Sequence, residues 1–100
     1  MEKFRMDAFD ELFKAVLKLK NLEDCRKFFE DVCTIKEMQD ITQRLEVARL
    51  LKTGLNYQAV SKETGASTAT ISRVNKCLNY GSGGYGLVID DKKESGNERV

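Results

Sequence analysis

The stretch Leu55–Leu78, LNYQAVSKETGASTATISRVNKCL, has the pattern of two short helices separated by a glycine. Asn56 and Ser67 are typical N-cap residues, and Gly65 lies where a tight turn requires a positive φ angle. We expect a helix-turn-helix over about residues 57–79, because this layout is typical of a pair whose second helix lies in the major groove of DNA.

The second helix of this pair has two faces at helical spacing. Ile71, Val74 and Leu78 are expected to face inward, whereas the outward face is small, polar and basic. Hydroxyl groups on it can contact phosphates or base edges, and basic side chains can neutralise phosphates. An ordinary helical hairpin with a solvated polar face has the same periodicity. The side chains expected to contact DNA are Gln58, Lys62, Ser67, Thr68, Ala69, Thr70, Ser72, Arg73 and Lys76.

The residues before the pair predict three further helices. An apolar stripe with the spacing i, i+3, i+4, i+7 predicts a helix over residues 2–20, which we expect to pack partly against a second subunit. Asn21 is the expected N-cap of the next helix. Thr34 and Glu37 form a capping box that opens a helix over residues 35–53, in which a short break is compatible with the pattern.

The segment after the pair, residues 80–89 (YGSGGYGLVI), changes character. Its four glycines permit a sharp turn, and Leu87-Val88-Ile89 is expected to form a short strand or a hydrophobic arm. The glycines fit the pattern G-x-G-x-x-G, but a dinucleotide site needs a strand before the glycines and a helix after them, so we reject a phosphate-binding role. The polar residues 91–100 are expected to be a disordered tail.

One hundred residues are enough for one small domain, which we place over residues 1–90. The net charge of +1 indicates no global attraction to nucleic acid. Residues 57–80, however, carry three basic side chains and one acidic side chain, and no acidic residue occurs between Glu63 and Asp90. This local excess of positive charge favours an anionic partner, although chance in a short window explains it as well.

The cysteine and histidine content excludes several kinds of site. Three cysteines without paired spacing, together with the lack of a signal peptide, indicate reduced thiols and a cytoplasmic protein. The sequence contains no histidine, so the usual zinc sites and histidine-based catalytic triads are absent. We therefore predict neither a metal site nor an enzyme. No apolar run reaches the roughly 20 residues that a membrane span needs.

The segment GASTATISRVNKCL, preceded by VSKET, resembles the DNA-reading half of the tryptophan repressor family, and RLEVARLLKTGLN resembles its central helix. Over roughly residues 5–90 the chain resembles the YerC/YecD-type branch of Trp-repressor-like bacterial proteins. This resemblance implies an all-α, intertwined homodimer whose N-terminal helices interlock. It also implies a repressor whose two recognition helices, about 34 Å apart, read a pseudo-palindromic operator.

The resemblance also implies a place for a ligand, since the family's amino-acid corepressor sits between the central and the recognition helix. The matching positions are Arg44, Arg73, Val74, Cys77 and, from the partner chain, Thr34. A glycine that leaves room for the indole corresponds to Val74, and a serine corresponds to Cys77. The methyl groups of Val74 would fill part of that space, so we hypothesise that L-tryptophan is not the corepressor. Either no ligand or a different effector remains open.

Two functions from different classes follow. The first is a sequence-specific, double-stranded DNA-binding transcriptional regulator. The alternative is a helical protein-interaction module that keeps the fold without specific DNA binding. The near-zero net charge supports this alternative, and the Leu87-Val88-Ile89 segment would be its contact.

Overall fold

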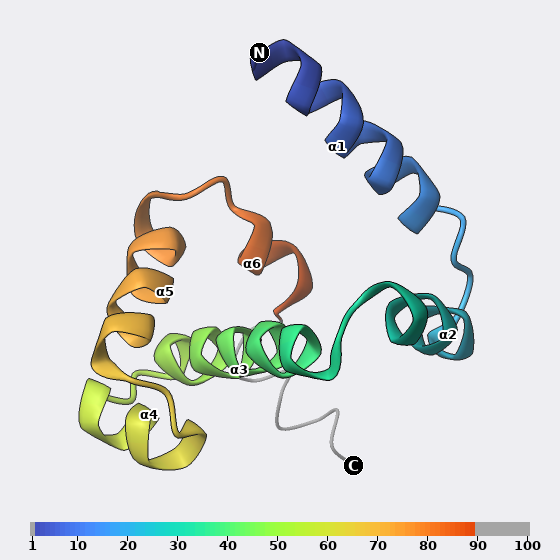
Figure 1. Ribbon diagram of the computed structural model, residues 1–100. Coiled ribbons are helices and arrows are strands. Elements are labelled where there is room, and N and C mark those ends of the chain that lie inside the picture. Colours follow the sequence, from blue (N-terminus) through green and yellow to red (C-terminus); the bar gives the residue numbers. More distant parts are fainter. Residues whose placement is uncertain (1, 90–100) are drawn as a thin grey trace. The chain divides into compact units, whose positions relative to one another are not determined.

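The computed structural model describes residues 2–89, with side chains from residue 7 onward, and every regular element in this range is a helix. This confirms the all-α prediction. The expected tail over residues 91–100 lies outside the described residues. The helices, shown in Figure 1, are α1 (Glu2–Val16), α2 (Leu22–Val32), α3 (Ile35–Lys52), α4 (Tyr57–Thr64), α5 (Thr68–Tyr80) and α6 (Gly84–Val88). None of these helices has both the length and the apolar character needed to cross a membrane.

The described chain divides into two compact units between Met38 and Gln39. The first unit contains α1 and α2. The apolar stripe of α1 is exposed, with Phe13 at 56% and Leu17 at 82% exposure, and α2 has no buried residue. The first unit therefore exposes the apolar surface that a helical protein normally covers.

The prediction of a helix over residues 2–20 is wrong at its end, because α1 stops at Val16. Turn-type hydrogen bonds follow it: the Lys18 amide donates to the Ala15 carbonyl at 3.0 Å. The Lys20 amide then donates to Asp24 Oδ2 at 3.0 Å. The residues after Val16 thus form the turn that leads into the start of α2 and cannot continue α1.

The predicted helix starts are confirmed by their caps. Asn21 Oδ1 accepts a hydrogen bond from the Asp24 amide at 2.8 Å. At the start of α3, Thr34 Oγ1 accepts from the Glu37 amide at 3.0 Å and Glu37 Oε1 accepts from the Thr34 amide at 2.8 Å, which completes the capping box. From there α3 runs without the short break that the sequence allowed.

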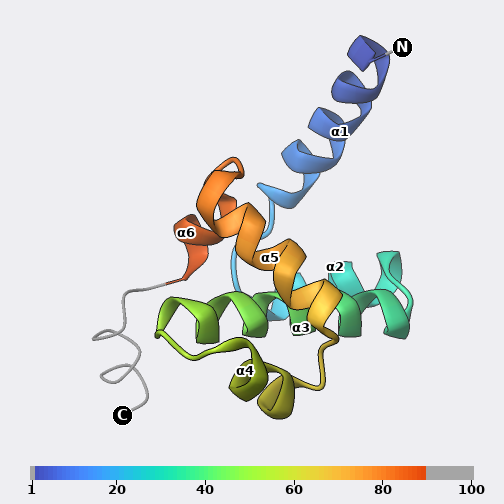
Figure 2. The ribbon, with the colours of Figure 1, turned by 90° about the vertical axis from the view of Figure 1, so that its left-hand side faces the viewer.

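The second unit surrounds a small core built from all its helices. Figure 2 shows α5 crossing α3, with α4 beside the first turn of α5. The buried side chains of this core belong to α3, α4 and α5, to the turn between α4 and α5, and to the residue that follows α6. The buried residues are Val47, Ala48, Val60, Ala66, Ile71, Val74 and Ile89.

The prediction of a strand or arm at Leu87-Val88-Ile89 is wrong. Gly83 has a φ angle of 86°, which reverses the chain and allows Gly84–Val88 to form α6. The Ile89 amide donates to the Tyr85 carbonyl at 3.0 Å, so these two residues lie four apart on one side of the helix. Both face the core, while Leu87 and Val88 remain exposed.

Candidate nucleic-acid interface

The turn between α4 and α5 is held by a dense set of local hydrogen bonds. Gly65 adopts the predicted left-handed conformation, with φ at 77°, and its amide donates to the Ser61 carbonyl at 2.7 Å. The Ser61 hydroxyl donates to the Ala66 carbonyl at 2.9 Å. Thr64 Oγ1 accepts from the Ala66 amide at 3.1 Å and donates to the Val60 carbonyl at 2.8 Å. These bonds fix the direction in which α5 leaves α4.

A further contact ties the turn to α3. Gln43 Nε2 donates to the Thr64 carbonyl at 3.2 Å, across 21 residues of sequence. Ala66 in this turn is only 2% exposed, and Val60 of α4 is fully buried. Gln43 could not be predicted from the sequence, because a polar side chain on a helix carries no signal that its partner lies on a distant turn.

The first turn of α5 uses two of the residues predicted to contact DNA as its cap. Ser67 Oγ accepts from the Thr70 amide at 3.1 Å, which confirms Ser67 as the N-cap. The same hydroxyl pairs with Thr70 Oγ1 at 3.2 Å, and Thr70 is half-buried. These hydroxyl groups are therefore engaged in holding the start of the helix.

The remaining predicted contact residues are exposed, and those on α5 lie on one side of the helix, which we call the α5 face. Arg73 and Lys76 make no ion pair with any described residue. The first turn of α5 carries no acidic residue, so the positive end of its helix dipole is not neutralised locally. The α5 face consists of Thr68, Ala69, Ser72, Arg73 and Lys76, and Gln58 and Lys62 are exposed on α4.

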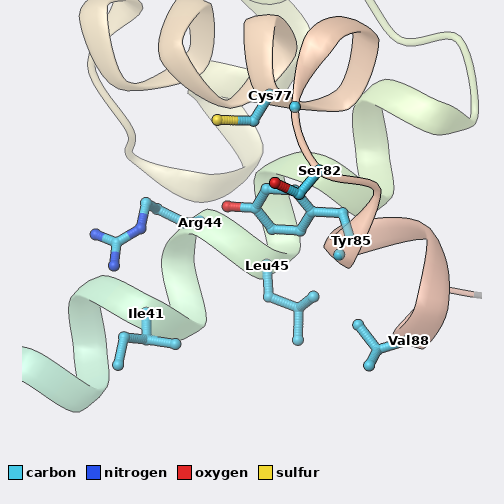
Figure 3. A pocket seen from close by; sticks show the side chains of 9 residues that line it. Ile41, Arg44, Leu45, Cys77, Ser82, Tyr85 and Val88 are labelled. Atoms are coloured by element: carbon cyan, nitrogen blue, oxygen red, sulfur yellow. The ribbon is translucent and has the colours of Figure 1, made fainter. Parts of the chain in front are cut away.

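A cavity of about 600 Å³ lies in the second unit between α3, the end of α5 and α6. Figure 3 shows the Tyr85 ring between Cys77 and Leu45, with Arg44 at the end of the cavity away from Val88. The wall is mainly apolar, and Arg44 is the one charged residue that lines it.

The cavity includes two of the five residues predicted to form a ligand pocket. Arg44 and Cys77 line it, whereas Arg73 is exposed on the α5 face and Val74 is 1% exposed in the core. Thr34 belongs to the first unit. Residues 81–88 also contribute to the cavity, which was not predicted; a tyrosine within a glycine-rich segment was the available signal in the sequence. These lining residues are Gly81, Ser82, Gly84, Tyr85 and Val88.

A family model and a known bacterial protein each match almost the whole chain. The family model described as Trp repressor protein matches residues 7–93. The "uncharacterized protein YerC" of Bacillus subtilis (strain 168) is 52% identical over 98 residues, which cover 98% of this chain and 94% of that protein.

Two crystal structures share the fold along most of the chain. A "putative Trp repressor" from Staphylococcus aureus has a TM-score of 0.79 and 49% identity, with 87% of each chain covered. A "TrpR like protein" from Eubacterium eligens ATCC 27750 has a TM-score of 0.80 and 50% identity, with 88% of this chain and 91% of that chain covered. The family resemblance and the all-helical, Trp-repressor-like fold are thereby confirmed.

Proposed function

This chain belongs to the Trp repressor family, and from that premise we propose that it is a homodimeric repressor that binds a pseudo-palindromic site in double-stranded DNA. The family consists of helical DNA-binding regulators rather than enzymes. The observation that supports the proposal in this chain is the α5 face, where small side chains and two cations without an ion pair to any described residue lie exposed on a helix held in place by the α4–α5 turn.

In the proposed complex the first turn of α5 enters the major groove, which is about 12 Å wide. Small side chains in that turn leave room for close approach to the base edges. Arg73 and Lys76 bind phosphates, and Lys62 on α4 adds a flanking contact. Gln58 lies near the start of α4, where free backbone amides also favour a phosphate. Ser67 and Thr70 act by holding the helix start, which refines their predicted role as direct contacts.

The proposed partner subunit explains why the first unit has so much exposed apolar surface. Phe9, Phe13 and Leu17 are each more than half exposed, as are Leu22 on α2 and Ile35 on α3. A helical unit with this composition lacks a core of its own, and a second copy of the chain would supply the missing partner. One domain over residues 1–90 is then completed within the dimer. The three cysteines are free thiols, in keeping with a cytoplasmic regulator.

Selection from a random DNA library tests DNA binding and symmetry together. The full chain is expected to enrich an inverted repeat whose half-site centres lie about 10 base pairs apart, because a dyad places its recognition helices one DNA turn apart. Sedimentation of the free protein is expected to give the mass of a dimer. Failure to enrich any sequence at low salt would contradict the proposal and favour the protein-interaction module, which the net charge of +1 supports.

Calorimetric titration with L-tryptophan is expected to show no saturable binding at micromolar concentration. Val74 packs among the core residues. By the family resemblance, its methyl groups would fill part of the space that a glycine leaves open for an indole. A tryptophan-binding member of the family, titrated in parallel, controls for the detection of heat. A micromolar isotherm with this chain would contradict the hypothesis that L-tryptophan is not its corepressor.

A further inference from the structure

We propose that the first turn of α5 reads its DNA half-site mainly through the C5-methyl groups of thymine, which the methyl groups of Thr68 and Ala69 contact. This inference rests on the proposed function and deepens it, because it names the base chemistry that the α5 face recognises. It predicts that the protein distinguishes thymine from uracil in otherwise identical DNA.

The first turn of α5 leaves only a few side-chain groups available for contact with DNA. The Ser67 hydroxyl is bonded to the Thr70 amide and to Thr70 Oγ1, and Thr70 is half-buried. Thr68 and Ala69 are the exposed side chains of this turn after the cap. Together they offer two methyl groups and one hydroxyl group to the groove.

Residues 68–74 lack the side chains that read adenine and cytosine in the major groove. Adenine is read in the major groove by the paired donor and acceptor of Asn or Gln, and cytosine by the acceptors of Asp or Glu. Residues 68–74, TATISRV, contain none of these four residue types. Ser72 can pair with either a donor or an acceptor, so it discriminates poorly.

Arg73 is the one side chain of residues 68–74 that could read guanine, but its position favours a phosphate. It follows Ala69 by four residues, one turn further from the helix start, and Lys76 lies three residues beyond it on the same face. In helix-turn-helix proteins the N-terminal residues of the recognition helix contact the base edges. We therefore assign these two cations, which lie further along the helix, to backbone contacts, which carry no sequence information.

Thymine alone presents a methyl group in the major groove, and apolar contact with it is a recognised form of direct readout. A methyl group from the protein and one from the base exclude water from each other. Burying one such group is expected to change affinity about fourfold. In a symmetric dimer the effects of several such contacts on affinity would multiply. Their product is sufficient for useful discrimination without bidentate hydrogen bonds.

The test uses duplexes of the selected operator in which single thymines are replaced by deoxyuridine, symmetrically in both half-sites. Uracil keeps every hydrogen-bonding group of thymine and lacks only the methyl group. Each symmetric replacement removes two contacted methyl groups, one in each half-site, so at constant salt affinity is expected to fall about sixteenfold. Thymines outside the half-sites serve as the DNA control, and replacing them is expected to leave affinity unchanged.

Matched protein variants assign the effect to the side chains. Thr68→Ser keeps the hydroxyl and removes the methyl group, so it is expected to lose the uracil effect at one thymine. Thr68→Val keeps a methyl group and removes the hydroxyl, so it is expected to retain that effect. Ala69→Gly is expected to suppress the effect at a different thymine. Circular dichroism of each variant confirms that the helices remain folded.

The outcomes separate the inference from the proposed function. Specific binding with no difference between thymine and uracil at any half-site position would overturn the inference and leave the DNA-binding proposal intact. Loss of the uracil effect in Thr68→Val, or its persistence in both Thr68→Ser and Ala69→Gly, would also overturn it. The absence of any specific DNA binding would instead overturn the proposed function.

Discussion

Replacing Ile71 with alanine is expected to lower the free energy of unfolding by about 3 kcal/mol. Ile71 is fully buried and is the largest of the completely enclosed side chains among the described residues. It points from α5 into a core that also holds Val47 of α3 and Val60 of α4. Removing its outer carbon atoms would leave a cavity where the three helices meet, and the melting temperature is expected to fall by roughly 15 °C.

Two neighbouring substitutions make this prediction specific. Ile71→Val removes one carbon atom and is expected to cost about 1 kcal/mol. Ser72→Ala changes an exposed side chain, and its effect on stability is expected to stay within about 0.5 kcal/mol. Thermal unfolding is measured at one fixed protein concentration, because the stability of a dimer depends on concentration. If Ile71→Ala melts together with the parent protein, the proposed core is wrong.

Replacing Arg73 with alanine in both subunits is expected to weaken DNA binding roughly a hundredfold, because it removes two hydrogen bonds to charged groups, each worth about 1.5 kcal/mol. The loss is expected to be similar for all DNA sequences, because the proposed partner of Arg73 is a phosphate. The slope of log affinity against log salt is expected to fall by about one for each phosphate contact removed. Fluorescence anisotropy titrations at several salt concentrations measure both quantities.

The dimer is expected to remain intact in Arg73→Ala, because the side chain is exposed and makes no ion pair with a described residue. Arg26→Ala is the matched control: it removes an exposed arginine of α2 that is not part of the α5 face, and it is expected to bind DNA as the parent does. Unchanged binding by Arg73→Ala would show that the α5 face is wrongly assigned. A loss confined to sites with guanine at one position would show that Arg73 reads a base.

Sequence patterns predicted the helices best where the signal is local. The helix-turn-helix was expected over about residues 57–79; α4 begins at Tyr57 as expected, and α5 extends one residue beyond the expected end. Both helices begin at a side-chain cap, and the turn between them needs a glycine in the left-handed region. Such features depend on residues three or four positions apart, so the sequence alone reveals them.

The parts that could not be predicted depend on distant contacts. Ile89 and Tyr85 face the core because Gly83 turns the chain back toward α3, and nothing near residue 89 in sequence indicates that burial. The cavity was only partly predicted for the same reason, since α6 supplies much of its wall. The residues of the α5 face are exposed, as predicted. Ser67 and Thr70 were also predicted to contact DNA, and only the hydrogen bonds show that their hydroxyl groups are occupied by the cap.

The burial of Ile89 has a consequence for the order of events during synthesis. Proteins are made from the N-terminus, and the core that supports α5 includes a residue that follows α5 and α6 in the chain. While the ribosome is still adding residues 81–88, α5 lacks this last apolar neighbour. The helix that we propose to read DNA therefore gains its full packing only after residue 89 has been added and has left the ribosome, which makes final folding a late step.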